Sequence, residues 1–403
     1  MVGTLRLSID AKLMTSDVVY KVNTPAFVFC AAQINAAVQM LRTALGNRDV
    51  RVLYSIKACG AEPVLEIIHP LVDGFSVSSP AEVRVALQFG GDSKCLQITS
   101  PGLRREWLLE LVGISHIVFN SISQWQRLRG EIPSSVSNAI RVNPGRSNVD
   151  DERYDPCRKY SKLGVPIATL IGSLSRSEIR KLEGIHVHNS CLGESWVPML
   201  ETVSEISARL DPLIGTMKWI NLGGGYVWDE TTDFDPLCEA VDVLSKRYGL
   251  EVFIEPGAGI VNSAGFLVAS VIDLFKNDGK SIAILDTTVN HLPEVFEYQF
   301  EPDVAEHVDG GRHEYILAGC SCLAGDLFGE YAFDEPLEIG SRITFENVGA
   351  YTIVKANMFN GINLPSVYTL GQTGEFELIK QFSLEDFVSR FGSGLNEYAN
   401  ANS

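Results

Sequence analysis

The residues of this sequence that are best placed for chemistry stand where apolar runs end, and the first of them is a lysine. Lys57 follows directly on an apolar run at 52–56. Burial at the end of a strand lowers the pKa of a lysine and makes its amine a usable nucleophile. A lysine whose ammonium group simply reaches solvent would have the same sequence pattern. The position alone therefore leaves both interpretations open.

Three consecutive glycines, Gly223, Gly224 and Gly225, follow the apolar run at 219–222. Consecutive glycines let backbone N–H groups converge on a phosphate without help from a lysine. The alternative is a flexible turn between a strand and a helix, which seldom needs three glycines in succession. We expect these glycines to bind a phosphate group.

An acidic motif, Glu255-Pro256-Gly257, ends the next apolar run at 251–254. A carboxylate at this place can keep a pyridinium nitrogen protonated, which is what pyridoxal phosphate needs to act as an electron sink. An acidic residue that caps the next helix would fit the motif equally well.

Two histidines, His186 and His188, end the run at 184–188. Alternation along a strand places both histidines on one face, so they could be two ligands of a zinc ion. No third ligand accompanies them at a suitable spacing, and we therefore predict that one histidine lies flat against a cofactor ring instead.

A thiol and a carboxylate, Cys322 and Asp326, stand four positions apart in a glycine-containing segment, and Tyr351 follows later. Such a loop can present an acid and an anchor for a ligand. A β-turn with a buried cysteine is the common explanation for either residue alone.

These groups require a scaffold that brings several strand ends together. Short apolar, β-branched runs alternate with segments of helical spacing up to about residue 262, which predicts a parallel sheet covered by helices. The runs lie at 26–30, 51–56, 72–77, 96–99, 116–119, 138–142, 184–188, 219–222 and 251–254. Nine runs exceed the eight strands of a (β/α)₈ barrel by one, so we expect one strand to lie elsewhere.

The pattern of apolar runs alternating with helical segments ends at about residue 262. Runs at 312–317, 342–346 and 376–381, punctuated by glycine and proline, predict an antiparallel β domain. We therefore predict an α/β plus β chain: an N-terminal extension and strand at 1–31 that packs with the β domain, a TIM-like (β/α)₈ barrel at 32–262, and a C-terminal antiparallel β domain at 263–403.

The composition excludes several classes of function. The net charge of −17 disfavours nucleic acid and anionic membrane surfaces as partners. Eight cysteines without C-x-x-C spacings support neither a zinc ribbon nor a thioredoxin-like motif. The sequence has no apolar run long enough to span a bilayer and no signal-peptide pattern, so we expect a cytoplasmic protein. The spacing of its cysteines and histidines indicates no metal site.

In this order, the groups resemble the alanine-racemase-like (fold type III) pyridoxal-phosphate decarboxylases, which act on ornithine, diaminopimelate and related amino acids. The resemblance is strongest to the carboxynorspermidine decarboxylases. It rests on IVFNSISQ at 117–124, SCLAGDLFGEYAF at 321–333, GAYTIVK at 349–355 and FNGINLP at 359–365.

The resemblance implies a role for each group, with pyridoxal 5′-phosphate as the cofactor. Lys57 would bond covalently to it, His188 would stack on its ring and Glu255 would pair with the ring nitrogen. The three glycines and Tyr351 would hold the phosphate, with Gly257 also at the cofactor. Cys322 would supply the proton after CO₂ departs, and Asp326 would bind the distal end of the substrate. The resemblance also implies a small-molecule carboxylated amine as the substrate, and a homodimer in which the partner subunit completes each site.

The sequence departs from these decarboxylases around the expected substrate pocket. Ala258 stands where they tend to carry an acid, and Glu194 belongs to a segment, HNSCLGES at 188–195, that differs from theirs. The implied reaction removes the α-carboxylate from a 3-amino-3-carboxypropyl group to leave an aminopropyl group.

Two carriers of that group fit the sequence. One is a polyamine, as in carboxynorspermidine or carboxyspermidine, and the other is a natural-product intermediate such as a microcin C-type peptidyl nucleotide. The lost acidic position favours the second carrier, whereas the matched strings favour the first. A catalytically inactive regulator would predict loss of the lysine or of the glycine run, and both are present; a racemase of the same fold is disfavoured by Cys322.

Overall fold

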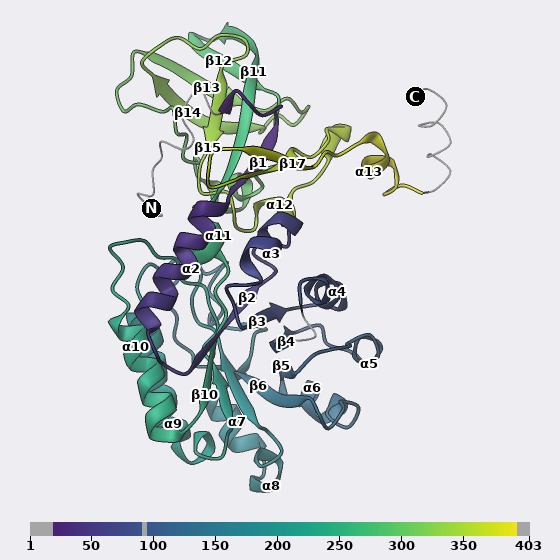
Figure 1. The fold of residues 1–403 in the computed structure, drawn as a ribbon, viewed down its shortest axis with the longest axis vertical. Coiled ribbons are helices and arrows are strands. Elements are labelled where there is room, and N and C mark those ends of the chain that lie inside the picture. Colours follow the sequence, from purple (N-terminus) through teal and green to yellow (C-terminus); the bar gives the residue numbers. More distant parts are fainter. Residues whose placement is uncertain (1–18, 91–94, 393–403) are drawn as a thin grey trace. The chain divides into compact units, whose positions relative to one another are not determined.

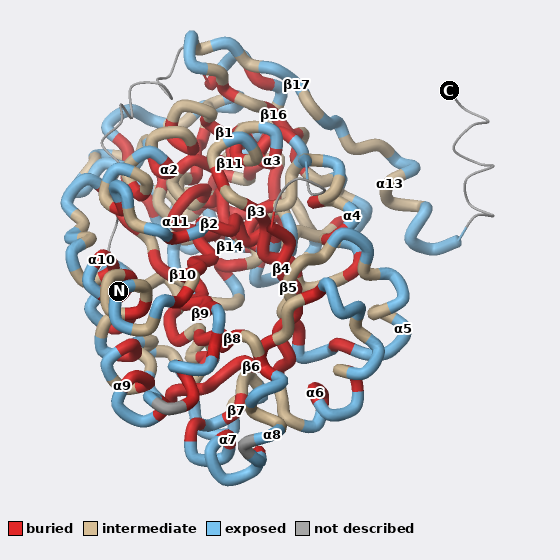
Figure 2. The backbone as a smooth tube through the Cα atoms, turned by 60° about the horizontal axis from the view of Figure 1, so that its bottom comes forward, coloured by how far each residue is buried: buried red, intermediate tan, exposed pale blue. Residues whose placement is uncertain are grey.

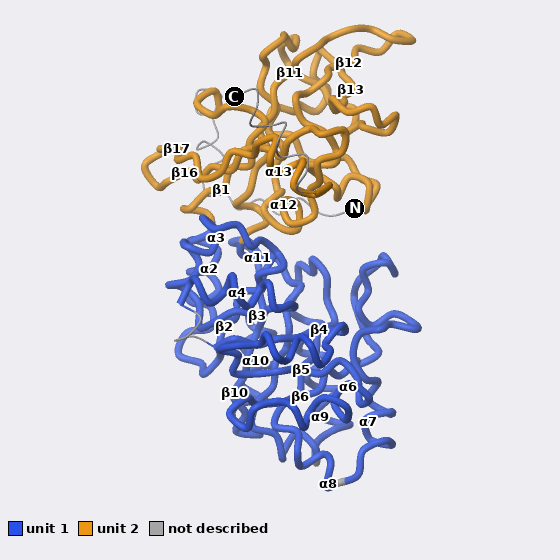
Figure 3. The backbone as a smooth tube through the Cα atoms, turned by 90° about the vertical axis from the view of Figure 1, so that its right-hand side faces the viewer, with its two compact units in different colours: residues 1–7, 34–260 blue, residues 8–33, 261–403 orange. Residues whose placement is uncertain are grey.

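The computed structural model describes residues 19–90 and 95–392 (Figure 1). They divide into two compact units (Figure 3), of which one comprises residues 34–260 and the other residues 19–33 and 261–392. Of the N-terminal segment predicted at 1–31, residues 1–18 lie outside the described residues.

The first unit is built on a closed ring of eight parallel strands. Their order around the ring is β2-β3-β4-β5-β6-β8-β9-β10, and β10 pairs with β2 to close it. The strands of the ring are β2 (Val50–Ser55), β3 (Gly74–Val77), β4 (Cys95–Ser100), β5 (His116–Phe119), β6 (Ser137–Asn143), β8 (Gly184–Val187), β9 (Trp219–Asn221) and β10 (Glu251–Ile254). A two-residue strand, β7 (Val165–Pro166), pairs with β6 outside the ring.

Helices surround this ring, and Figure 2 shows the strands largely buried while the outer helix faces are exposed. In the first of them, Ile34, Val38 and Leu41 recur at helical spacing and are fully buried. Gly46 follows its end with a φ of +57°, a left-handed conformation that glycine adopts without strain. The helical segments are α2 (Ala31–Leu45), α3 (Glu62–Ile68), α4 (Pro80–Gln88), α5 (Arg105–Leu108), α6 (Ile122–Leu128), α7 (Ile167–Ser173), α8 (Arg176–Ile179), α9 (Val197–Ile214), α10 (Asp235–Asp242), η3 (Val243–Arg247) and α11 (Ala258–Val261).

The second unit is a β domain whose sheet runs in the order β14-β13-β12-β11-β1-β16-β17, with β15 paired to β11. Its strands are β1 (Ala26–Cys30), β11 (Gly265–Asn277), β12 (Lys280–Leu285), β13 (His313–Ala318), β14 (Leu327–Phe333), β15 (Arg342–Phe345), β16 (Ser366–Leu370) and β17 (Phe376–Lys380). Its short helical segments are η4 (Val295–Gln299), α12 (Thr352–Lys355), η5 (Phe359–Gly361) and α13 (Leu384–Val388).

The predicted barrel and β domain are both confirmed, and the surplus strand is resolved as expected. The run at 26–30 forms β1, which pairs with β11 and β16 of the β domain. The β domain is not wholly antiparallel, because β1 pairs in parallel with β16 and β12 in parallel with β13. In both parallel pairs the connecting chain is long, and a long crossover is what a parallel pair requires.

Candidate active site

The predicted site residues of the barrel come from four strands that are successive neighbours in the ring. His188 directly follows β8, the glycines follow β9, Glu255 directly follows β10, and Lys57 lies just beyond β2. Since β8, β9, β10 and β2 pair in this order and are all parallel, their carboxyl ends meet on one side of the barrel. This is the face on which parallel barrels carry their chemistry.

The carboxylate of Glu255 makes polar contacts with several side chains of this site. Its Oε1 accepts hydrogen bonds from Nδ2 of Asn221 at 2.8 Å and from Nε2 of Gln97 at 3.2 Å. Its Oε2 lies 3.3 Å from Nε2 of His186. Burial by itself raises the pKa of Glu255, but His186 and the charge of Lys57 outweigh burial and hold the pKa below its ordinary value. The carboxylate is therefore ionised.

The imidazole of His186 is neutral and donates to that carboxylate. Burial is the main cause that lowers its pKa, and the attraction of Glu255 opposes it. Its Nδ1 is buried with no hydrogen-bond partner among the described residues. The proton accordingly sits on Nε2, where Glu255 accepts it.

The side chain of Lys57 is exposed within this ring of strand ends. Desolvation by the surrounding protein lowers its pKa, and the nearby charge of Glu255 opposes that effect. A lowered pKa increases the fraction of neutral amine, the form in which a lysine acts as a nucleophile.

The glycine loop holds the ring of His188. The N–H of Gly224 donates to Nδ1 of His188 at 3.1 Å, and the N–H of Gly223 donates to Oδ1 of Asn221 at 2.7 Å. Two of the three amides predicted to face a phosphate are therefore already used within the protein. Within the described residues the N–H of Gly225 has no protein acceptor, which leaves it available to a ligand.

Sequence reasoning missed three polar residues of this site: Gln97 on β4, Arg141 on β6 and Asn221 at the end of β9. Arg141 is only 8% exposed, and burial lowers its pKa while Glu255 opposes that effect. A charged residue inside a run predicted as a buried strand was the available signal for Arg141. The other two resembled ordinary residues of alternating strands.

The β domain carries the remaining predicted residues, and there the thiol of Cys322 is exposed on a loop held by other side chains. The backbone N–H of Cys322 donates to Oδ1 of Asn360 at 2.8 Å. Oδ2 of Asp326 accepts from the N–H of Ser321 at 2.9 Å, and Oδ1 accepts from the N–H of Val289 at 2.8 Å. Asp326, at 3% exposed, is thus an anchor of this loop.

Tyr351 precedes α12 in a conformation that is unusual for a large side chain. Its φ is +66°, in the left-handed region, where a bulky residue is strained. The Lys355 Nζ lies 5.5 Å from the centre of its ring. Strain of this kind is concentrated at functional positions.

Comparison with known families identifies this arrangement. Residues 31–262 match the model described as "Pyridoxal-dependent decarboxylase, pyridoxal binding domain", and residues 258–349 match the "C-terminal sheet domain" of the same decarboxylases. The chain belongs to the pyridoxal-dependent decarboxylase family.

Three similar proteins carry related names. A "Carboxyaminopropylagmatine decarboxylase" of Synechocystis is 32% identical over 92% of this chain and 95% of its own length. A "Carboxynorspermidine/carboxyspermidine decarboxylase" of Campylobacter jejuni is 31% identical over 92% and 99%. The crystal structure of carboxynorspermidine decarboxylase complexed with norspermidine, also from C. jejuni, superposes with a TM-score of 0.83 at 28% identity, covering 92% of this chain and 100% of that one.

Pyridoxal 5′-phosphate is the cofactor of this decarboxylase, and the barrel residues fit it. An ionised, buried Glu255 suits a protonated ring nitrogen. The amine of Lys57, whose pKa is lowered by desolvation, suits a bond to an aldehyde, and the unpartnered N–H of Gly225 suits a phosphate oxygen. Because both the lysine and the glycine loop are intact, the inactive-regulator alternative has no support.

Three further residues that the sequence placed at the site lie in varied surroundings. Gly257 is buried, and a Cβ there would lie 2.8 Å from the Cβ of Ala58, so close packing alone explains this glycine. Ala258 is 4% exposed at the start of α11, whereas Glu194 is exposed. Contact of Gly257 with the cofactor, and of Ala258 and Glu194 with the substrate, stays a prediction.

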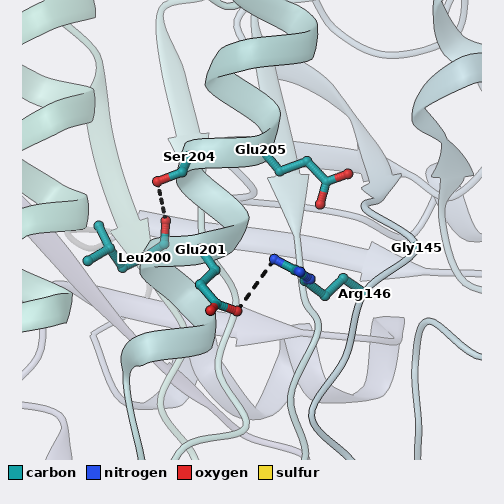
Figure 4. A pocket seen from close by; sticks show the side chains of 6 residues that line it. All are labelled: Gly145, Arg146, Leu200, Glu201, Ser204 and Glu205. Carbon is teal, nitrogen blue, oxygen red and sulfur yellow. Dashed lines mark hydrogen bonds and ion pairs between the residues drawn. The ribbon is translucent and has the colours of Figure 1, made fainter.

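A cavity of about 660 Å³ lies beside the loop that follows β6, next to the first half of α9 (Figure 4). It is lined by Gly145, Arg146, Leu200, Glu201, Ser204 and Glu205. At this cavity, Nη1 of Arg146 lies 3.5 Å from Oε2 of Glu201. None of the predicted site residues lines this cavity.

The described residues contain no group of three or more His, Cys, Asp or Glu placed to hold a metal ion. In the same part of the chain, no helix is long and apolar enough to cross a membrane.

Proposed function

We propose that this decarboxylase removes the α-carboxylate from a 3-amino-3-carboxypropyl group carried on an amine, and leaves an aminopropyl group. The observation that carries the proposal is the similarity, over nearly the full length of both chains, to relatives named for carboxynorspermidine, carboxyspermidine and carboxyaminopropylagmatine. Each of these names describes a carboxylated aminopropyl group on a larger amine.

Residues of the barrel would hold the cofactor. Lys57 would bond to it covalently, His188 would lie against its ring, and Glu255 would pair with its ring nitrogen. Gly225 would donate its N–H to the phosphate, and Tyr351 of the β domain would hold that phosphate as well. The bound cofactor supplies an electron sink for the charge left at Cα when CO₂ departs.

The reaction breaks the bond between Cα and the carboxylate and requires one proton at Cα in its place. We propose that the thiol of Cys322 donates this proton. The exposed position of Cys322 and the fixing of its backbone by Asn360 support this role. A thiol held in one place can deliver its proton to a single atom, and the thiolate that remains can take up a new proton from solvent.

We also propose a homodimer in which Cys322 of each chain serves the barrel site of the other. The location of the thiol on the β domain and of the lysine on the barrel supports this proposal. A two-fold axis would place the same two surfaces together twice and so complete two sites at once.

A second candidate substrate is a natural-product intermediate, such as a peptidyl nucleotide, that bears the same aminocarboxypropyl group. The observation that favours it is the uncharged residue at position 258, since buried ammonium groups of a polyamine require carboxylate partners.

The role predicted for Asp326 at the distal end of the substrate is less favoured, because both of its oxygens accept backbone N–H groups.

The test is the product of the reaction. The purified enzyme with pyridoxal phosphate is incubated separately with carboxynorspermidine, carboxyspermidine, carboxyaminopropylagmatine and an aminocarboxypropyl nucleotide, and products are identified by mass spectrometry. We expect loss of CO₂ from at least one of the three amines. Turnover of the nucleotide alone would favour the second candidate, and turnover of none of the four would overturn the proposal.

A further inference from the structure

Asn221 is buried between two parts of the proposed cofactor site, and both ends of its side-chain amide are used. It ends β9 and is fully inaccessible to solvent. Its Nδ2 donates to Oε1 of Glu255 at 2.8 Å, and its Oδ1 accepts from the N–H of Gly223 at 2.7 Å. A backbone N–H can only donate and an ionised carboxylate can only accept, so these partners fix the orientation of the amide.

Backbone contacts also restrict the conformation of the glycine loop, in addition to its hydrogen bond with Asn221. Gly223 has a φ of +69°, and a Cβ there would lie 2.5 Å from the carbonyl oxygen of Val187. The carbonyl of Gly223 accepts from the N–H of Glu255 at 2.7 Å. The loop and Glu255 are therefore joined twice, once through backbone groups and once through Asn221.

An amide is the side chain that this junction requires. An aspartate at position 221 could still accept from Gly223, but it would place a second carboxylate against Glu255, and like charges at that distance disfavour each other's ionisation. An alanine would leave the N–H of Gly223 and an oxygen of Glu255 without these partners, in a buried place where unpaired polar groups are costly.

We propose that Asn221 is a positioning residue that sets the Glu255 carboxylate and the Gly223–Gly225 loop in one fixed relationship, and so couples binding of the cofactor's ring to binding of its phosphate. This inference rests on the cofactor roles given under the proposed function. It does not depend on which amine is the substrate.

The chain offers a matched control in Gln97. Its Nε2 also donates to Oε1 of Glu255, at 3.2 Å, and it has no hydrogen bond to the glycine loop. Gln97→Met therefore disturbs the same carboxylate with nearly the same volume but leaves the loop untouched.

The experiment compares two ligands on the full-length protein after removal of its cofactor. Dissociation constants are measured by absorbance for pyridoxal phosphate and for pyridoxal, which lacks the phosphate. The dissociation constant of pyridoxal divided by that of pyridoxal phosphate reports how much the phosphate contributes to binding. We expect Gln97→Met to weaken both ligands and keep the wild-type ratio, and Asn221→Ala to weaken both and also lower the ratio about tenfold, the effect of one buried hydrogen bond.

Several outcomes would overturn the inference. An unchanged ratio in Asn221→Ala would mean that Asn221 acts on Glu255 alone, and an equally lowered ratio in Gln97→Met would mean that the loop responds to any change at Glu255. Equal affinity of the wild type for both ligands would show that the loop holds no phosphate. If thermal melting shows Asn221→Ala to be unfolded, Asn221→Ser takes its place, since it also lacks the amide donor. Failure of the proposed substrate would leave all these binding ratios unaffected.

Discussion

The backbone N–H of Cys322 is fixed by the side chain of Asn360, which lies 38 positions further along the chain and accepts its hydrogen bond at 2.8 Å. Asn360 itself has a φ of +57° within η5, a left-handed conformation that asparagine tolerates better than most residues. The exposed thiol thus stands on a backbone that is held from two sides, by Asn360 and by the loop anchored on Asp326.

Substitution of Asp326 should impair the turnover rate more than the affinity for substrate. Asp326→Ala removes the acceptor of two backbone N–H groups, so the loop that carries Cys322 shifts. We expect kcat to fall about ten- to a hundred-fold, as small misplacements of a reacting group do, with little change in KM. Steady-state kinetics give both constants, and Asp326→Asn, which keeps one carbonyl acceptor, should lie between wild type and Asp326→Ala. A large rise in KM at unchanged kcat would instead support direct contact between Asp326 and substrate.

Lys57 should be the residue that carries the cofactor. Borohydride treatment of the enzyme with pyridoxal phosphate, followed by peptide mapping, should locate the reduced adduct on the peptide that contains Lys57. Lys57→Ala should lose both the adduct and the visible absorbance of the bound cofactor, because the nucleophilic amine is gone. An adduct on another lysine would show that the site is assigned incorrectly.

Mixing two inactive variants should restore activity if the sites are shared between subunits. Lys57→Ala and Cys322→Ala should each be nearly inactive alone. Random exchange makes about half of the dimers mixed, and each mixed dimer has one intact site of two, so about a quarter of wild-type activity should return. Mass spectrometry of intact dimers confirms that exchange has taken place. Exchange without recovery would place Lys57 and Cys322 in the site of one chain.

His291 should make the β domain less stable as the pH falls. Its side chain is fully buried, its Nδ1 lies 3.0 Å from Oγ1 of Thr287, and burial lowers its pKa from 6.5 to about 4, although Asp326 opposes this. Between those values the unfolded chain binds a proton that the folded chain does not, so stability is lost as the pH falls through the unfolded value near 6.5.

The measurement compares wild type with His291→Gln by chemical denaturation at pH 7.5 and 5.5, both above the isoelectric point of 4.9. Going from the higher to the lower pH, the wild type should lose about 1.3 kcal/mol more unfolding free energy than the variant. Parallel losses in the two proteins would mean that His291 is as easily protonated in the folded chain as in the unfolded one.

The strands of the barrel, and the polar residues that directly follow them, could be predicted from the sequence. Apolar runs located the eight strands of the barrel to within two residues, and the chemistry-bearing residues that follow four of those runs do lie on one side of the barrel. Lys57, His188 and Glu255 could be found because a polar residue directly after a buried run is unusual enough to notice.

The residues that the sequence did not reveal owe their roles to distant partners. Gln97 and Glu255 are 158 positions apart, and only closure of the barrel brings their side chains together. Asn221 resembles the ordinary end of a strand until the positions of Glu255 and Gly223 are known. The parallel pairing of β1 with β16 has the same origin, since it depends on which strand edges are left open once the rest of the sheet has formed.

The position of β1 also has a consequence for synthesis of the chain. β1 precedes all the strands of the barrel in the sequence, yet it lies between β11, which begins at Gly265, and β16, which begins at Ser366. All eight strands of the barrel ring emerge from the ribosome before either of these partners. The apolar residues of β1 therefore stay without these partners while the whole barrel is synthesised, and early association with a chaperone would protect them during that time.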